Sequence, residues 1–126
     1  MDARFLRTRM LLGADAMERL EKAHVCVLGL GGVGSWCAEA LARSGVGELT
    51  LMDQDQVETS NLNRQAEALE STLGLPKAEA MAQRVLAVNP ACRVRPVQGR
   101  YEVETREDFF AQRYDYIVDA IDLVSG

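Results

Sequence analysis

A glycine-rich turn between two apolar segments constrains the fold of this chain more than any other stretch. The run Gly29-Leu30-Gly31-Gly32-Val33-Gly34-Ser35 follows an apolar segment that begins at His24, and a segment of helical character follows from Trp36 to Arg43. A strand, a glycine turn and a helix form the context of a phosphate-binding loop, because glycines allow a tight turn and a close approach of phosphate oxygens. The start of the following helix adds free N–H groups and the positive end of its dipole. Dinucleotides and mononucleotides are both bound by such loops, so the turn alone leaves the nucleotide open.

Composition limits the classes of protein that need to be considered. The chain of 126 residues is long enough for one domain with a modest core, and its formal net charge of −5 argues against a strong nucleic-acid surface on this part alone. That charge does not exclude a nucleic-acid substrate bound elsewhere. No apolar run approaches the roughly 20 residues of a membrane span, and the N-terminus lacks the apolar core of a secretory signal. The cysteines Cys26, Cys37 and Cys92 form no C-x-x-C pair, so we expect mostly structural cysteines and a reducing, cytoplasmic setting.

The rest of the chain alternates between strand and helix patterns. Two helices are expected before the first strand, one over residues 2–12 and one from an Asp15–Glu18 cap to about Lys22. Strands are expected over 24–29, 48–53, 92–98 and 116–121, and helices over 33–43, 60–69, 77–88 and 105–112. This order predicts an α/β fold: a doubly wound, Rossmann-like, mostly parallel sheet with helices on both faces, preceded by N-terminal helices. The expected division is a helical segment over 1–23 and, over 24–126, the N-terminal part of a nucleotide-binding domain that is truncated at its C-terminal end.

Two carboxylates are expected at the carboxyl edge of this sheet, where doubly wound folds bind their ligands. Asp53 ends the second predicted strand, and Asp122 follows the fourth. An acid at the position of Asp53 can hydrogen-bond ribose hydroxyls, although a carboxylate that only organises a turn would also fit. Asp122 can hold Mg²⁺, which prefers carboxylate and phosphate oxygens. With the glycine turn and Asp53 alone, a nicotinamide dehydrogenase fits as well as an ATP-dependent enzyme.

Two basic residues favour the ATP-dependent enzyme. Asn61 and Arg64 are spaced to share one helix face, and Arg64 can fork onto phosphate oxygens. Lys77 opens the helix that follows Gly74-Leu75-Pro76, and a lysine near a triphosphate lowers the repulsion that an attacking carboxylate meets. Each residue alone would fit a solvated surface charge. Together, one acid for ribose, one acid for a metal and two cations for phosphates favour a triphosphate site.

The ordered motifs resemble the adenylation domain of the E1-like activating enzymes, the family that includes the HesA, MoeB and ThiF proteins and the ubiquitin-activating enzymes. The similarity covers nearly the whole chain and rests on Gly-x-Gly-Gly-Val-Gly at 29–34, Asp53-x-Asp55, Asn61-x-x-Arg64-Gln65, Gly74-x-x-Lys77 and Asp119-Ala120-Ile121-Asp122. It implies an enzyme that binds ATP with Mg²⁺ and transfers AMP to a carboxylate with release of pyrophosphate.

The resemblance also implies roles for individual residues. The implied nucleotide-binding residues are Gly29, Gly31, Gly32, Gly34, Asp53, Asn61, Arg64, Gln65 and Lys77, with Asp122 as the metal ligand. Arg7, Arg64, Lys77 and Asp122 are the implied catalytic residues. Family members use an N-terminal arginine near the γ-phosphate, often from the partner subunit, so the match at Arg7 implies a homodimer. Phe5-Leu6 replaces a more polar pair of the sulfur-carrier activators, which makes this match the weaker one.

Within the family, the sequence resembles the tRNA threonylcarbamoyladenosine dehydratase branch most. The stretches that carry this resemblance are Arg4-Phe5, Leu12-Gly13, Gly32–Trp36, Ala38–Gly45 and Val118–Asp122. In that branch, ATP activates the carboxylate of the threonylcarbamoyl group on a tRNA adenosine, and internal attack closes a ring with net loss of water. The alternative is adenylation of the C-terminal glycine of a ubiquitin-like sulfur-carrier protein, with a sulfur-carrier or sulfur-acceptor protein as partner. A nucleotide-sensing module without catalysis and a nicotinamide oxidoreductase are more distant alternatives. For Trp36, packing of the helix against the sheet and a role near the site both stay open.

Overall fold

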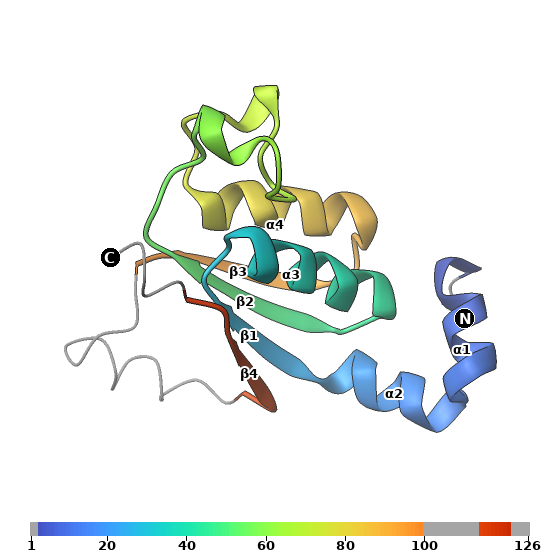
Figure 1. Ribbon diagram of the computed structural model, residues 1–126. Helices are drawn as coiled ribbons and strands as arrows, with labels where there is room; N and C mark the ends of the chain where they lie inside the picture. Colours follow the sequence, from blue (N-terminus) through green and yellow to red (C-terminus); the bar gives the residue numbers. More distant parts are fainter. Residues whose placement is uncertain (1–2, 100–113, 122–126) are drawn as a thin grey trace.

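The computed structural model describes residues 3–99 and 114–121 (Figure 1). A 3-10 turn at Ala3–Phe5 leads into two short helices, α1 (Leu6–Leu12) and α2 (Ala14–Lys22). The α/β part then runs β1 (His24–Leu28), α3 (Gly32–Ser44), β2 (Glu48–Asp53), α4 (Lys77–Val88), β3 (Arg93–Gln98) and β4 (Tyr116–Asp119). These bounds agree with the predicted strands and with the predicted helices around α3 and α4 to within two residues. No helix in the described part of the chain is long and apolar enough to cross a membrane.

The four strands form one parallel sheet in the order β3-β2-β1-β4. From β1 the chain moves outward through β2 to β3, and β4 then pairs with the opposite side of β1. This reversal of direction is the switch point of a doubly wound sheet, where the carboxyl ends of β1 and β4 leave a crevice for a ligand. The prediction of a doubly wound parallel sheet is therefore confirmed.

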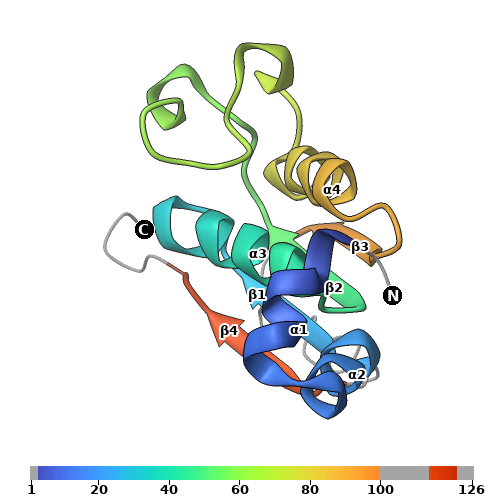
Figure 2. The same ribbon diagram turned by 90° about the vertical axis from the view of Figure 1, so that its right-hand side faces the viewer.

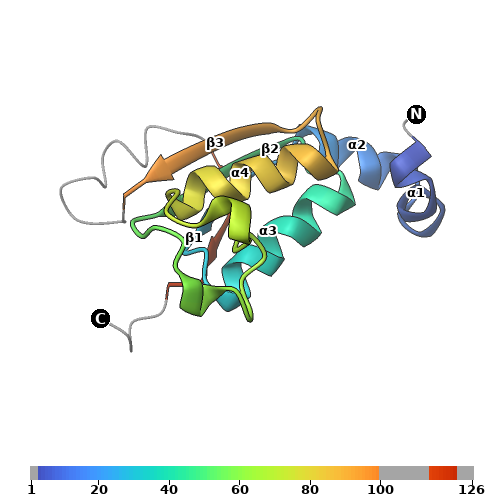
Figure 3. The ribbon, with the colours of Figure 1, turned by 90° about the horizontal axis from the view of Figure 1, so that it is seen from above.

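The main core lies between the sheet and the helices α3 and α4, which run side by side over one face (Figure 3). Val25 and Val27 of β1 and Leu49 and Leu51 of β2 point into this core. Cys26 and Leu28 point to the other face and pack with Met52, Val97 and Tyr114. Because β1 is buried along its whole length, it reads as a continuous apolar run without alternation. The helix predicted at 105–112 for the second face lies outside the described residues.

The two N-terminal helices lie at the end of the sheet opposite the glycine turn (Figures 1 and 2). There they meet the end of α3, since a Cβ at Gly45 would touch Met17 and Phe5. Gly47 donates its N–H to the carbonyl of Leu20 at 3.0 Å and lies so close to Glu21 that no side chain fits. This contact fixes the N-terminal helices to the start of β2.

Two local predictions were wrong. The helix expected over 60–69 is replaced by irregular turns between two 3-10 turns, Thr59–Asn61 and Glu70–Thr72. Side chains compete with a helical backbone there, since Asn61 accepts the Glu58 N–H and Thr72 accepts the Leu69 N–H. The cap expected from Asp15 is also absent, because α2 begins directly after Gly13, whose φ of 88° turns the chain without a side-chain cap.

The glycine turn is held by close packing of its own backbone. Gly29 has a φ of +89°, and a Cβ there would lie 2.8 Å from the carbonyl oxygen of Ala120. A Cβ at Gly34 would lie only 1.8 Å from the Gly29 carbonyl oxygen, so the first turn of α3 packs directly on the end of β1. Leu30 is fully buried between them and anchors the turn in the core.

We predict that Gly34→Ala lowers the free energy of unfolding by about 3 kcal/mol or more, because the added methyl collides with backbone that cannot move alone. Gly32→Ala is the matched control, since its Cβ would meet only the Arg64 side chain, at 3.8 Å. We expect that change to stay within about 1 kcal/mol. Denaturant unfolding of both variants measures the difference, and equal stabilities would contradict the packing argument.

Candidate nucleotide-binding site

The candidate site lies at the carboxyl edge of the sheet, where the glycine turn leaves β1 next to β4. The turn is joined to its neighbours by backbone bonds: Gly29 donates to Met52 of β2 at 2.8 Å, and Ala120 donates to Leu28 at 2.8 Å. Gly29 therefore lies between the ends of β2 and β4. Asp122, the predicted metal ligand, lies outside the described residues.

Asp53 fastens the glycine turn to the end of β2. Its Oδ2 accepts the N–H of Leu30 at 2.7 Å, and its Oδ1 accepts the N–H of Asp55 at 2.8 Å. Sequence reasoning offered ribose binding and turn organisation as alternatives, and the structure shows the second directly. Each carboxylate oxygen has a further lone pair for a ribose hydroxyl, so ribose binding by Asp53 stays a prediction.

The segment that carries Arg64 and Gln65 lies over the glycine turn. A Cβ at Gly32 would lie 3.8 Å from Arg64 Cγ, and one at Gly31 would lie 4.0 Å from Gln65 Nε2. The N–H of Ala66 bonds to Ser35 Oγ at 3.0 Å, which ties this segment to the first turn of α3. The structure thus brings together two motifs that are far apart in the sequence.

The charged group of Arg64 is exposed and oriented by its own loop. Its Nη1 donates to the Ser60 carbonyl at 2.9 Å and to Asn63 Oδ1 at 3.0 Å. A guanidinium has five N–H donors, so bonds through Nη1 leave others directed to a ligand. Both partners are neutral oxygens, and the positive charge of Arg64 therefore remains available to an anion.

Asn61 and Gln65 are buried where the sequence predicted ligand contacts. The Asn61 side-chain oxygen accepts the Glu58 N–H at 2.8 Å and so shapes the loop. Gln65 is 6% exposed, and its Oε1 has no hydrogen-bond partner among the described residues. A buried amide oxygen without a partner beside the glycine turn is the kind of group that a bound ligand would satisfy.

Lys77 is brought close to the same edge by the start of α4. Its backbone N–H bonds to the Asp55 carbonyl at 2.9 Å, two residues after the end of β2. Its side chain is buried, and its charge acts on the carboxyl of Glu67. Of the two predicted cations, Arg64 therefore lies over the glycine turn, and Lys77 begins α4 next to the end of β2.

Arg7 is not brought to this edge within the chain. It lies exposed on α1, at the opposite end of the sheet (Figures 1 and 2). Its predicted role near the phosphates stays a prediction, and in this fold that role needs a second copy of the chain.

The arrangement fits a triphosphate. A Cβ at Gly31 or Gly32 would meet only the side chain of Gln65 or Arg64, at 3.8 Å or more, whereas Gly29 and Gly34 are closely surrounded by backbone. The first N–H groups of α3 have no side-chain cap, so they and the helix dipole can bind phosphate oxygens.

The described residues include no group of three His, Cys, Asp or Glu side chains that could hold a metal ion.

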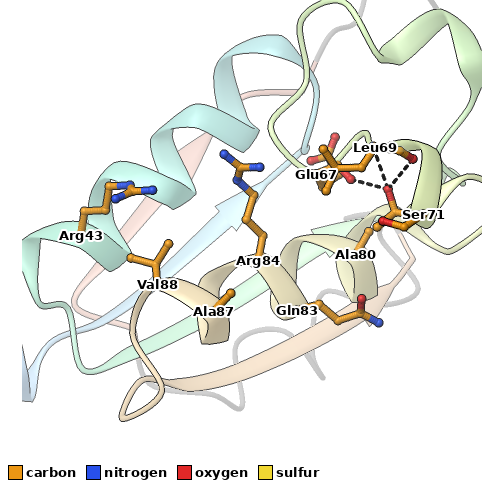
Figure 4. Close-up of a pocket in the computed structure, with 10 residues that line it drawn as sticks. Arg43, Glu67, Leu69, Ser71, Ala80, Gln83, Arg84, Ala87 and Val88 are labelled. Carbon is orange, nitrogen blue, oxygen red and sulfur yellow. Dashed lines mark hydrogen bonds between the residues drawn. The ribbon is translucent and has the colours of Figure 1, made fainter.

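Sequence reasoning missed Glu67, a fully buried carboxyl beside this site. Neither of its carboxylate oxygens has a hydrogen-bond partner among the described residues. Burial raises its pKa to about 8, the Lys77 ammonium opposes that rise, and the Asp53 carboxylate adds to it. Glu67 lines a cavity of about 420 Å³, together with Arg43 of α3, residues of α4 and the segment 69–72 (Figure 4). An acid between two alanines, Ala66 and Ala68, was the only sequence signal.

Two of the cysteines, Cys26 and Cys92, are buried and show no sign of a reactive role. Burial raises the pKa of the Cys26 thiol to about 12 and that of Cys92 to about 11. Both are therefore neutral thiols, as the sequence predicted for structural cysteines.

The sequence pattern of the ThiF family matches residues 5–125, which include every part of this site. The chain belongs to the ThiF family. The predicted resemblance to the E1-like activating enzymes is thereby confirmed for the family.

Curated ThiF-family relatives include tRNA threonylcarbamoyladenosine dehydratases. The protein of that name from Haemophilus influenzae is 46% identical over 123 residues, 98% of this chain and 47% of the relative. The one from Escherichia coli is 47% identical over 121 residues, 96% of this chain and 45% of the relative. Molybdopterin-synthase adenylyltransferase from Salmonella typhimurium is 37% identical over 124 residues, 97% of this chain and 49% of the relative. The chain spans about half the length of these relatives.

Solved ThiF-family structures include the same dehydratase from E. coli in complex with ATP. This chain superposes on it with a TM-score of 0.92 at 47% identity, over 96% of this chain and 50% of that one. The complex of that enzyme with AMP gives the same score. The predicted similarity to the dehydratase branch is confirmed by these higher identities.

We predict that Glu67 makes the stability of the protein fall as the pH rises from about 4.5 to about 8. In this interval the folded state keeps the Glu67 proton, since burial raises its pKa to about 8, while the unfolded chain has lost it. Glu67→Gln should remove this dependence. The stability of the variant relative to the wild type should then increase by roughly 2 kcal/mol between pH 5.5 and pH 7.5.

Denaturant unfolding of the full-length protein at the two pH values measures this difference. Glu79→Gln, which changes an exposed carboxyl of α4, is the control and should keep the pH dependence of the wild type. If the free energy of unfolding changes by the same amount between the two pH values in the wild type and in Glu67→Gln, Glu67 is ionised in the folded state.

Proposed function

We propose that the full-length protein is an enzyme that uses ATP to adenylate a substrate carboxylate with release of pyrophosphate. The observation that carries this proposal is the position of Arg64 over Gly32, at the uncapped amino end of α3. An ATP-bound relative that is 47% identical shares the fold at a TM-score of 0.92, which favours a triphosphate over a dinucleotide.

The chain's own residues divide the work of binding and activation. The N–H groups around Gly31 and Gly32 bind phosphate oxygens, and Asp53 accepts ribose hydroxyls while it holds the turn. Arg64 and Lys77 offset the negative charge that an attacking carboxylate meets at the phosphates. ATP supplies the adenylyl group that turns a poor electrophile into one with a good leaving group. Mg²⁺ is proposed to be held through Asp122 and to offset further phosphate charge.

The proposed acceptor is the threonylcarbamoyl group on an adenosine of tRNA, whose activated carboxylate closes a ring with loss of water. Support comes from the relatives with this name at 46–47% identity, compared with 37% for the molybdopterin-synthase adenylyltransferase.

A second acceptor is the C-terminal glycine of a ubiquitin-like sulfur-carrier protein. A relative named SAMP-activating enzyme E1, from Haloferax volcanii, is 40% identical over 111 residues and supports this alternative. Both acceptors present a carboxylate to the same adenylating edge, so the residues described here serve either reaction.

The active unit is proposed to be a homodimer in the cytoplasm. Arg7 lies at the end of the sheet away from the glycine turn, so it reaches the phosphates of a site only from a partner subunit. A shift of the dimer equilibrium by Mg·ATP, measured by analytical ultracentrifugation, tests this contribution.

The full-length protein incubated with Mg·ATP and tRNA that carries threonylcarbamoyladenosine should convert that nucleoside to one that has lost one water. Digestion of the tRNA followed by mass spectrometry measures the product, and a reaction without ATP is the control. Unchanged nucleoside together with pyrophosphate release on a carrier protein would replace the tRNA acceptor by the sulfur-carrier alternative.

We predict that Arg64→Ala and Lys77→Ala each lower kcat/KM for adenylation by about 100-fold, a loss of roughly 3 kcal/mol of transition-state stabilisation. Asp122→Asn should abolish adenylation, because the proposed Mg²⁺ ligand is lost. Arg93→Ala, which removes an exposed arginine at the start of β3, should keep wild-type rates. Pyrophosphate release at matched thermal stability is the measurement, and a wild-type rate in any of the three site variants would remove that residue from the site.

A further inference from the structure

Trp36 has an unusual environment for the only tryptophan in these residues. It lies in the second turn of α3, and 48% of its surface is exposed, so it does not fill the core between helix and sheet. Its indole Nε1 donates a hydrogen bond of 2.7 Å to the carbonyl of Arg64. The polar end of this large side chain is thus directed at the backbone of the residue that carries the candidate phosphate-binding cation.

Two consecutive residues of α3 hold the Arg64 loop from both sides of Gln65. Trp36 binds the carbonyl of Arg64, and Ser35 Oγ accepts the N–H of Ala66 at 3.0 Å. These bonds fix the chain direction where the Arg64 side chain begins its path over Gly32. The loop between β2 and α4 has no regular helix at this point, so such side-chain bonds set its position.

The indole ring is itself held by an ion-pair network between α3 and α4. The Arg84 guanidinium carbon lies 5.6 Å from the centre of the Trp36 ring, within the range of a cation–π contact. Arg84 also bonds to Glu39, which pairs with Arg43 at 3.3 Å. The hydrogen bond from Arg84, with the charges of both arginines, lowers the pKa of the Glu39 carboxyl. Figure 4 shows Arg84 rising from α4 between Arg43 and Glu67.

We propose that Trp36 is a positioning residue of the nucleotide site: its indole N–H sets Arg64 against the glycine turn, and Arg84 orients the ring that does so. This inference rests on the proposed function, because it assumes that Arg64 binds the phosphates of ATP. Of the two alternatives for Trp36, the half-exposed ring and the bond from its polar atom to the loop favour a role near the site over packing against the sheet.

The test uses Trp36→Phe, which keeps an aromatic ring on this face of α3 and removes the N–H donor together with one of the two fused rings. Calorimetric titration of the full-length protein with Mg·ATP and, separately, with AMP measures affinity in the wild type, Trp36→Phe, Arg64→Ala and the double variant. We expect Trp36→Phe to raise the Kd of ATP about fivefold to tenfold, in line with the loss of one hydrogen bond. The Kd of AMP should change less than twofold, because the cation is proposed to contact the phosphates that AMP lacks.

The double variant distinguishes a role of Trp36 in positioning Arg64 from a general loss of order in the nucleotide site. If Trp36 acts through Arg64, Trp36→Phe should add nothing to the loss caused by Arg64→Ala. Additive losses, or equal losses for ATP and AMP, would overturn the proposal. Leu86→Ala, which trims an exposed side chain near the end of α4, is the control and should leave both affinities unchanged.

Two further results keep the test decisive. If Trp36→Phe does not fold, Arg84→Gln takes its place, and it should weaken ATP binding in the presence of Arg64 but not in its absence. If the wild type binds no ATP, the proposed function fails and the inference fails with it. If the wild type binds ATP and the cycle is additive, only the role of Trp36 is overturned.

Discussion

The candidate site depends on the bond between the Asp53 carboxylate and the backbone N–H of Leu30. This bond joins the end of β2 to the turn that follows β1, and it acts where the sheet reverses its strand order. The Leu30 side chain is fully buried in the core, so one residue is fixed by packing on its apolar side and by a charge-assisted hydrogen bond on its polar side. Because Leu30 is held in this way, the neighbouring Gly31 and Gly32 stay partly exposed at the candidate site. A carboxylate that shapes the turn can therefore also serve the nucleotide.

The four glycines of the turn serve two purposes that the sequence alone does not distinguish. Gly29 and Gly34 are required because backbone atoms of the same turn, or of the two residues that follow β4, occupy the space of a side chain. A side chain at Gly31 or Gly32 would meet only the side chain of Gln65 or Arg64, at 3.8 Å or more. The first pair builds the turn, and the second pair leaves room for phosphate. The loop that carries Arg64 lies beside Gly32. The glycine turn is thus held by backbone packing on one side of the site, and the Arg64 loop is held by bonds from Trp36 and Ser35 on the other.

The sequence predicted the parts of this molecule that follow from periodicity and from glycine chemistry. The strands, the helix that opens at Lys77 and the left-handed end of α3 at Gly45 all agree with the structure, because local pattern and tertiary packing favour the same conformation. The helix predicted from Ser60 to Leu69 was wrong, because hydrogen bonds between the backbone and the side chains of Asn61 and Thr72 replace helical ones. Such competition leaves no periodic pattern in the sequence. The roles of Asp53 towards Leu30 and of Trp36 towards Arg64 depend on contacts between segments far apart in the chain. No spacing within either segment could have indicated them.

The loop that bears Arg64 and the strands beneath it are held by different kinds of contact. Two side-chain bonds join the loop to α3, one from Trp36 at the exposed edge and one to the buried Ser35, and Ala66 packs in the core beside them. The strands are held by backbone bonds and by a continuous apolar core. An exposed polar bond can be exchanged for a bond to water at small net cost, whereas buried apolar surface cannot be exposed locally at such a cost. The direction of the loop can therefore be changed by substitution at the exposed edge while the sheet and the glycine turn keep their packing.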